Sequence, residues 1–192
     1  MCRAHPGGAE VDLSLLFVDV RGSTTMAEQM SGAEFSRLMN RFYAAATDVL
    51  IKTDAFIDKL IGDEVMAVYL PIFTGQSHAR AAVQAAQDLL RVTGHGDLGG
   101  PWLPVGVGVH TGITFFGTVS GAEGTFSDFT ALGDNVNITA RLASQAGPGE
   151  ALISDAACSA AGLDLGHLEQ RQLELKGKSE PVSVRVVRTT PG

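Results

Sequence analysis

Two aspartates stand where short apolar runs of this sequence end or turn. Asp19 follows the run 13–18, and Asp63 lies in a Gly-Asp turn between the runs 55–60 and 65–70. If the first run pairs between the other central strands of one sheet, both carboxylates lie at one edge of that sheet. Carboxylate oxygens are ligands that Mg²⁺ prefers, and such a site keeps positions for water and substrate phosphates. The pair therefore predicts a divalent-metal site, although either aspartate alone is better explained as a turn former or helix cap.

A possible phosphate cradle follows the first aspartate. Gly22, Ser23 and Thr24 stand where a helix should begin. Backbone N–H groups at the start of a helix have no partner within it and can bind phosphate oxygens. Every capped helix offers such donors, so this motif alone is weak support for a phosphate site.

Other polar residues are ambiguous when each is taken alone. Lys59 lies in an apolar strand-like run, where an edge lysine can extend its ammonium group to solvent. Asn137 and Arg141 fall four residues apart and share one helix face. Lys176 and Lys178 lie in a glycine-containing turn. Each of these residues has a structural explanation as a solvated side chain.

The elements that must position these residues follow the order βαββαβ. Apolar runs predict strands at 13–18, 55–60, 65–70 and 105–110, the last with a hairpin partner at 113–119. Helical periodicity predicts one helix from a capping box at Ser31 and Glu34 to about Lys52, and another over 77–92. This order is typical of a ferredoxin-like α+β core with helices on one face of an antiparallel sheet.

Additional αβ elements are expected around that core. Asp134 should cap a third helix, and Thr25 with Glu28 has the spacing of a further capping box. Residues 120–128 should form a loop or a protruding hairpin. The closing strands are expected at 151–154, 168–175 and 182–187.

The expected division of the chain is simple. We expect residues 1–12 to form an N-terminal tail, residues 13–188 a single domain and residues 189–192 a C-terminal tail.

Composition limits the classes of function. The chain has 192 residues, and its 14 lysines and arginines against 21 aspartates and glutamates give a net charge of −7. Nucleic-acid and anionic-membrane surfaces need concentrated positive charge, which this chain lacks. No apolar stretch approaches the roughly 20 residues that cross a bilayer, and the two cysteines form no disulfide framework. We therefore expect a cytoplasmic protein without nucleic-acid or membrane partners.

Taken together, five segments resemble the class III nucleotidyl cyclase catalytic domain, in the order in which that family carries them. The segments are FVDVRGST at 17–24, DKLIGDEVM at 58–66, GVGVHTG at 106–112, FTALGDNVNITARL at 129–142 and LKGK at 175–178. The resemblance covers the chain from about Leu13 to Val187. It implies the nucleotidyl cyclase fold and the conversion of ATP to 3′,5′-cyclic AMP and pyrophosphate, in a homodimer whose two active sites are shared.

The resemblance also implies roles for the matching positions. Asp19, Asp63 and the Val20 carbonyl match the ligands of two Mg²⁺ or Mn²⁺ ions. Lys59 and Thr130 match the residues that select the base, with Lys59 donating to an adenine ring nitrogen. The implied reaction is an in-line attack of the ribose 3′-oxygen on the α-phosphorus, with pyrophosphate as the leaving group.

Further matches concern the ribose and the phosphates. Asn137 matches the residue that orients the ribose, and Arg141 the residue that meets charge developing on the α-phosphate. Lys176 matches the lysine that binds the triphosphate, with Lys178 as the alternative. In the family dimer the metal-binding aspartates come from one subunit, and the base, ribose and phosphate residues come from the other.

Two positions depart from the commonest family pattern. Gly106 stands where many members carry an arginine that contacts the distal phosphates, and Thr130 where many adenylyl cyclases carry aspartate. Threonine at that position resembles the bicarbonate-responsive subgroup. The alternatives are a weakly active or non-catalytic dimer that senses nucleotide or bicarbonate, and a guanylate cyclase. A polymerase-palm or diguanylate-cyclase relative is disfavoured, because the sequence has no GGDEF-like hairpin.

Overall fold

The computed structural model describes residues 3–5, 7–120, 127–164, 167–175, 178 and 180–189. The strands are β1 Arg3–His5, β2 Gly8–Val20, β3 Phe56–Ile61, β4 Glu64–Tyr69, β5 Val105–Ser120, β6 Ser127–Leu132, β7 Glu150–Ser154, β8 Gln170–Leu173 and β9 Val182–Arg188. The helices are α1 Ser23–Gln29, α2 Gly32–Lys52, α3 Pro71–Thr74, α4 His78–Val92, α5 Asp134–Gln145 and α6 Asp155–Ala161, with a 3-10 turn at Gly75–Ser77.

The predicted βαββαβ core is confirmed. The main path of the sheet runs β3-β4-β2-β5-β7-β9-β8, with β1 paired to β2 and β6 paired to β5. Strand β2 lies between β4 and β5 and is antiparallel to both. Helices α2 and α4 pack on one face of this core, where Phe42 and Leu89 are buried against Leu16 and Val18.

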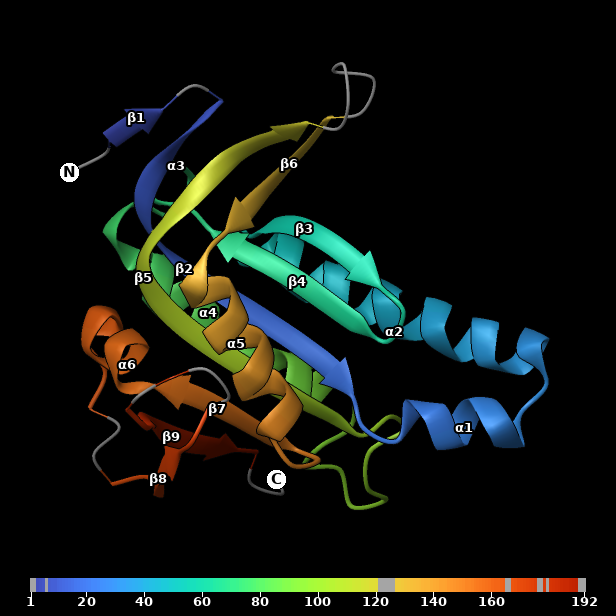
Figure 1. Cartoon of the computed structure of the whole chain (residues 1–192). Coiled ribbons are helices and arrows are strands. Elements are labelled where there is room, and N and C mark those ends of the chain that lie inside the picture. Colours follow the sequence, from blue (N-terminus) through green and yellow to red (C-terminus); the bar gives the residue numbers. More distant parts are fainter. Residues whose placement is uncertain are drawn as a thin grey trace.

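The remaining elements depart from the expected one-sided, antiparallel arrangement. Strands β5 and β7 pair in parallel, so the complete sheet is mixed. Helix α5 covers the face opposite α2 and α4 (Figure 1), where Ala143 packs with Leu15 and Phe17 of β2. A β-strand alternates its side chains between two faces, so the apolar residues on both faces of β2 need a cover on each side.

Two glycines of β5 let α5 approach the sheet closely. A Cβ atom on Gly108 would lie 2.4 Å from the Ala143 backbone nitrogen, and one on Gly106 would lie 2.8 Å from the Ala146 carbonyl oxygen. Gly106 is the position at which the family pattern favours arginine. In this chain it is a contact surface for α5, so the departure from that pattern has a packing reason.

The expected hairpin at 105–119 is wrong. Val105–Ser120 is one continuous strand, paired with β2 from Gly8 opposite Gly117 to Val20 opposite Val105. Its hairpin partner is β6, and residues 121–126 of the expected loop lie outside the described residues. Gly112 lies between the two expected strands, and a Cβ atom there would lie 2.7 Å from the Asn135 amide nitrogen. This glycine allows contact with α5 rather than a reversal of the chain.

The amino-terminal strand is also longer than predicted. Residues 8–12, which we expected in an N-terminal tail, continue β2, and residues 3–5 form β1 beside it. The long pairing with β5 explains the extension, because each added residue of one strand completes backbone hydrogen bonds of the other.

The helix starts were predicted with mixed success. The capping box at the start of α2 is confirmed, since Ser31 Oγ accepts from the Glu34 backbone and Glu34 accepts from the Ser31 backbone. The box expected at Thr25 and Glu28 is wrong, because α1 already begins at Ser23. Asp134 is the first residue of α5 rather than its cap, and Gly133 occupies the cap position. Among the described residues no helix is both long and apolar enough to span a membrane.

Candidate active site

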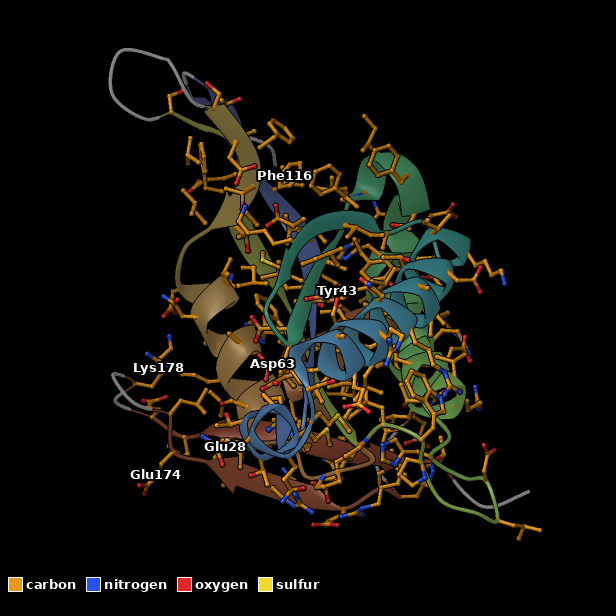
Figure 2. The ribbon with its side chains drawn as sticks, turned by 90° about the vertical axis from the view of Figure 1, so that its right-hand side faces the viewer. Glu28, Tyr43, Asp63, Phe116, Glu174 and Lys178 are labelled. Carbon is orange, nitrogen blue, oxygen red and sulfur yellow. The ribbon has the colours of Figure 1, made fainter. Side chains whose placement is uncertain are left out.

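The structure places the two predicted metal-binding aspartates at one edge of the sheet. Asp19 is the next-to-last residue of β2, and Asp63 lies in the turn between β3 and β4. Strand β4 is the antiparallel neighbour of β2. The Val20 backbone N–H donates to the Asp63 carbonyl over 3.0 Å, which ties the turn to the strand end. Figure 2 shows Asp63 at the tip of this hairpin. The convergence of the two carboxylates agrees with the sequence-based expectation.

Two hydroxyl groups fix the tip of the hairpin. The Ser23 hydroxyl, at the start of α1, donates to the Asp63 carboxylate, and the Tyr43 hydroxyl of α2 donates to the Gly62 carbonyl. Gly62 has a positive φ of 59°, a conformation that glycine adopts without steric cost. The side chain of Ser23 therefore positions a carboxylate, and any phosphate contact of this residue would use its backbone N–H.

The predicted phosphate cradle lies directly beside this carboxylate pair. Gly22 has a φ of 74° and precedes the first turn of α1, so Gly22, Ser23 and Thr24 leave β2 in a tight bend. Backbone N–H groups in the first turn of a helix point out of its amino-terminal end. This placement is compatible with a phosphate near the two carboxylates.

Arg21, which the sequence analysis missed, neutralises part of the negative charge of the two aspartates. Arg21 forms an ion pair with Asp19 and donates from Nη1 to the Ser144 carbonyl over 2.7 Å. Burial is the main reason why the pKa of Asp19 is raised, and the negative charge of Asp63 raises this pKa further. The Arg21 guanidinium has the opposite effect and lowers it. The two aspartates thus lie close enough to repel one another electrostatically.

A third carboxylate, also missed from the sequence, lies opposite Asp19. Glu64 is the direct cross-strand partner of Asp19 in the β2–β4 register. Burial raises the pKa of Glu64 to about 7, and the neighbouring charges of Asp19 and Asp63 contribute. The signal in the sequence was an acid next to Asp63, but its position opposite Asp19 depends on the register of two distant strands.

The donor set fits a hard divalent cation. Asp19 and Asp63 offer carboxylate oxygens, and one guanidinium does not balance the three acids at this edge. In the described part of the chain no group of three or more acidic, histidine or cysteine residues is arranged to enclose a metal. A site with two protein carboxylates suits Mg²⁺ or Mn²⁺, because these ions keep water and substrate oxygens in their coordination sphere.

The two predicted base-selecting residues meet at a shared carboxylate. Thr130 of β6 donates from Oγ1 to Asp58 Oδ2 over 2.7 Å. Lys59 of β3 has its Nζ 3.5 Å from Asp58 Oδ1 and also forms an ion pair with Asp128. The hydrogen bond to Asp128 is the main reason why the pKa of Lys59 is raised. The sequence analysis named Lys59 and Thr130 but not the aspartate between them.

The pair on α5 faces away from the protein core. Asn137 is exposed and Arg141 is half-buried, while Ile138 and Leu142 point into the apolar interior. Neither Asn137 nor Arg141 makes a side-chain hydrogen bond or ion pair with any other described residue. Within the described part of the chain Arg141 is therefore a cation without a charged partner, which suits contact with an anionic group.

Of the two predicted phosphate-binding lysines, one lies within the described residues. Lys176 lies outside them, so its placement is not part of the site described here. Lys178 forms an ion pair with Asp134, the first residue of α5. Figure 2 shows Lys178 beside that helix. A phosphate contact of Lys178 would have to compete with this carboxylate.

The predicted residues therefore form three separate groups in one chain. The carboxylate group contains Asp19 and Asp63, the base group contains Lys59 and Thr130, and the α5 group contains Asn137 and Arg141. Across the described ranges, no side-chain hydrogen bond or ion pair joins one group to another.

Comparison with known proteins identifies relatives in sequence and in fold. A model of the adenylate and guanylate cyclase catalytic domain matches residues 9–187. An adenylate cyclase of Anabaena cylindrica is 32% identical over 187 residues, an alignment that covers 92% of this chain and 36% of the relative. The chain thus spans about a third of that relative's length.

Solved structures lead to the same group of proteins. The guanylyl cyclase Cya2 superposes with a TM-score of 0.82 at 27% identity, covering 97% of this chain and 95% of that one. The adenylyl cyclase CyaB from P. aeruginosa gives a TM-score of 0.77 at 28% identity, with 93% and 94% of the two chains covered. Proteins named for either nucleotide therefore share this fold.

Proposed function

Because this chain belongs to the adenylate and guanylate cyclase catalytic domain family, we propose that it converts ATP to 3′,5′-cyclic AMP and pyrophosphate. The observation that carries the proposal is the pairing of Asp19 and Asp63 at one sheet edge, held by the 3.0 Å hydrogen bond from Val20 to Asp63. We further propose that residues 13–188 with the β2 extension form the catalytic domain.

The carboxylate group would hold the metal cofactor. Asp19, Asp63 and the Val20 carbonyl would bind Mg²⁺ or Mn²⁺, two ions per site. Such ions, when bound, lower the pKa of a hydroxyl and neutralise a pyrophosphate leaving group. Ser23 holds the Asp63 carboxylate in place through its hydroxyl, and the amides of residues 22–24 would donate to phosphate oxygens.

The base group would recognise adenine. Lys59 carries an ammonium that can only donate, and the adenine ring nitrogen opposite it is an acceptor. The Thr130 hydroxyl would accept from the adenine amino group. Support for adenine comes from the shared Asp58 contact, which keeps Lys59 and Thr130 next to one another.

The α5 group would orient the ribose and stabilise the transition state. Asn137 would hydrogen-bond the ribose and bring its 3′-oxygen in line with the α-phosphorus. The unpaired guanidinium of Arg141 would meet the charge that develops on the α-phosphate. Lys176, or Lys178 if its ion pair with Asp134 opens, would bind the triphosphate.

We propose that the complete site needs two copies of the chain. No side-chain hydrogen bond or ion pair joins the carboxylate group to the base or α5 groups among the described residues. A homodimer in which one protomer supplies the carboxylates and its partner the other groups would bring them around one nucleotide.

Product formation tests this proposal directly. Purified protein incubated with Mn²⁺ and ATP should produce cyclic AMP, and GTP should produce much less cyclic GMP. Asp63→Asn should abolish production, because a neutral amide binds a divalent cation poorly. A higher rate with GTP would assign the chain to the guanylate cyclases, and an absence of both products would leave a nucleotide-sensing module.

Thr130 motivates one further arm of the same assay, on its resemblance to the bicarbonate-responsive subgroup. Bicarbonate added at constant pH and ionic strength should stimulate turnover. An unchanged rate would remove bicarbonate from the proposed partners.

A further inference from the structure

We propose that Asp58 determines which nucleobase this chain accepts, because it fixes the direction in which the Thr130 hydroxyl donates its proton. The inference rests on the proposed function, in which Lys59 and Thr130 contact the base. Asp58 is a positioning residue here, since it contacts Thr130 and Lys59 rather than the nucleotide.

A bulge in β3 places Asp58 beside Lys59. The β3–β4 register pairs Ile57 with Ala67 and Lys59 with Met66, so Asp58 is the extra residue between them. Successive side chains of a regular strand point to opposite faces. A bulge redirects one of them, and both Asp58 and Lys59 contact residues of β6 in this structure.

The Asp58 carboxylate is buried with few polar partners. Its side chain is 0% exposed, and Oδ1 lies 3.5 Å from Lys59 Nζ. Oδ1 has no hydrogen bond among the described residues, so the bond from Thr130 to Oδ2 is the one that this carboxylate receives from a side chain. An ionised carboxylate removed from water needs its hydrogen bonds, so the Thr130 proton is held firmly.

The direction of that proton limits what Thr130 can offer a ligand. A hydroxyl group has one proton and two lone pairs. Thr130 Oγ1 donates to Asp58 Oδ2 over 2.7 Å, and the alternative acceptor, the Ala131 carbonyl, is 3.3 Å away. Both alternatives are acceptors inside the protein. A bound base therefore meets the lone pairs of Thr130 and not its proton.

Adenine and guanine differ at the atom that would meet this hydroxyl. Adenine carries an amino group, which donates, whereas guanine carries a carbonyl oxygen, which accepts. A hydroxyl restricted to accepting can bind the adenine amino group but leaves the guanine oxygen unpaired. Leaving a buried polar group unpaired is a strong source of discrimination between ligands.

The second partner of Lys59 provides a matched comparison. Asp128 is also a carboxylate paired with Lys59, but its side chain is 38% exposed, and among the described residues Thr130 donates to Asp58 and not to Asp128. Replacing Asp128 changes the charge near Lys59 and leaves the direction of the Thr130 proton unchanged. Comparing a variant of Asp58 with a variant of Asp128 thus separates an effect on the Thr130 hydroxyl from a general effect of charge near Lys59.

The test compares the binding of two nucleotides that cannot react. Both 3′-deoxy-ATP and 3′-deoxy-GTP lack the attacking hydroxyl, so calorimetric titration with Mn²⁺ measures binding alone. In Asp58→Asn the amide can donate to Thr130 and free its proton for the guanine oxygen. We expect the preference for 3′-deoxy-ATP to fall roughly tenfold or more, with a melting temperature close to that of the wild type.

Further variants make the result specific. Asp128→Asn should keep the wild-type preference. In a Thr130→Val background, Asp58→Asn should no longer change the preference, because no hydroxyl remains to be redirected. If Asp58→Asn does not fold, Asp58→Ser replaces it, since the smaller hydroxyl can also donate to Thr130.

Failure of this inference can be distinguished from failure of the proposed function. The role of Asp58 is overturned if Asp58→Asn leaves the preference for 3′-deoxy-ATP unchanged. It is also overturned if Asp58→Asn lowers this preference equally in the Thr130→Val background. A wild type that prefers 3′-deoxy-GTP, or binds neither nucleotide, overturns both ideas. A wild type that prefers 3′-deoxy-ATP but forms no cyclic product contradicts the proposed reaction alone, and the binding ratios still decide the role of Asp58.

Discussion

Arg141 shows how a single side chain connects sequence to proposed chemistry. It is half-buried on α5 and has no hydrogen bond or ion pair with the other described residues. Several other arginines bind carboxylates, and Arg171 and Arg188, for example, both form ion pairs with Glu150. An unpaired guanidinium of this kind is available to a phosphate.

Replacing Arg141 tests its part in the proposed transition state. Arg141→Ala should lower turnover by roughly two orders of magnitude or more, the loss expected for one preorganised donor. The melting temperature should change little, because the side chain stabilises nothing else in the described structure. Arg91→Ala, which removes an exposed guanidinium from the opposite face of the sheet, is the control. Near-normal turnover of Arg141→Ala would exclude this residue from the mechanism.

At the scale of elements, the contact between α5 and β5 determines where the α5 group lies. Gly106 and Gly108 bring the helix backbone against the strand, and Gly112 makes room for Asn135. Close packing of this kind leaves no space for a methyl group. The position of Asn137 and Arg141 relative to the sheet therefore depends on glycines that carry no chemistry themselves.

A single methyl group tests this contact. Gly108→Ala would place Cβ 2.4 Å from the Ala143 nitrogen, so α5 must shift, and we expect a loss of about 1–3 kcal/mol in the free energy of unfolding. Urea denaturation measures the change. Gly32→Ala is the control, because a Cβ there meets nothing within 4 Å and alanine favours a helix. Equal stabilities of the two variants would show that α5 does not press on β5.

At the scale of the whole molecule, the carboxyl-terminal strands are joined by one ionic cluster. Glu150 of β7 accepts two hydrogen bonds of 2.7 Å from Arg171 of β8 and one of 2.5 Å from Arg188 of β9. The hydrogen bonds from Arg171 are the main cause that lowers the pKa of Glu150 to about 2, with smaller contributions from the Gly147 backbone and Arg188.

This cluster predicts an acid dependence of stability. Folding lowers the pKa of Glu150, so as the pH falls the unfolded chain takes up its proton first. The stabilisation is complete above the unfolded pKa of 4.5 and disappears as the pH approaches 2. Glu150→Gln should cost about 2–3 kcal/mol at pH 7 and progressively less below pH 4.5 in urea denaturation.

The control for this measurement is Glu174→Gln, which changes an exposed carboxylate without ionic partners among the described residues. Its effect should be small at every pH. A Glu150→Gln deficit that is the same at pH 3 and pH 7 would contradict the role of the ionised carboxylate.

Assembly is the second property of the whole molecule that can be tested. If two protomers share each site, Asp63→Asn and Arg141→Ala damage opposite halves of it. Each variant alone should be inactive, whereas an equimolar mixture should recover activity, because a mixed dimer carries one undamaged site. Mixed dimers detected without recovered activity would contradict a shared site.

The sequence by itself determined the core and most of the candidate residues. Strand and helix periodicity determined the βαββαβ order, and the turn positions of Asp19 and Asp63 predicted their convergence. Both predictions were possible because alternation, capping and turns are local properties of a chain. The continuous strand β5 could not be predicted, since its length follows from pairing with β2, which is distant in the sequence.

Only the tertiary structure decided which carboxylates accompany those residues. Asp58 meets Thr130 across 72 positions of sequence, and Glu64 faces Asp19 through the β2–β4 register. A bulge at Asp58 sets the first contact, and strand register sets the second. Both depend on which distant strands pair and in what alignment, and that choice minimises the free energy of the complete sheet rather than of any local segment.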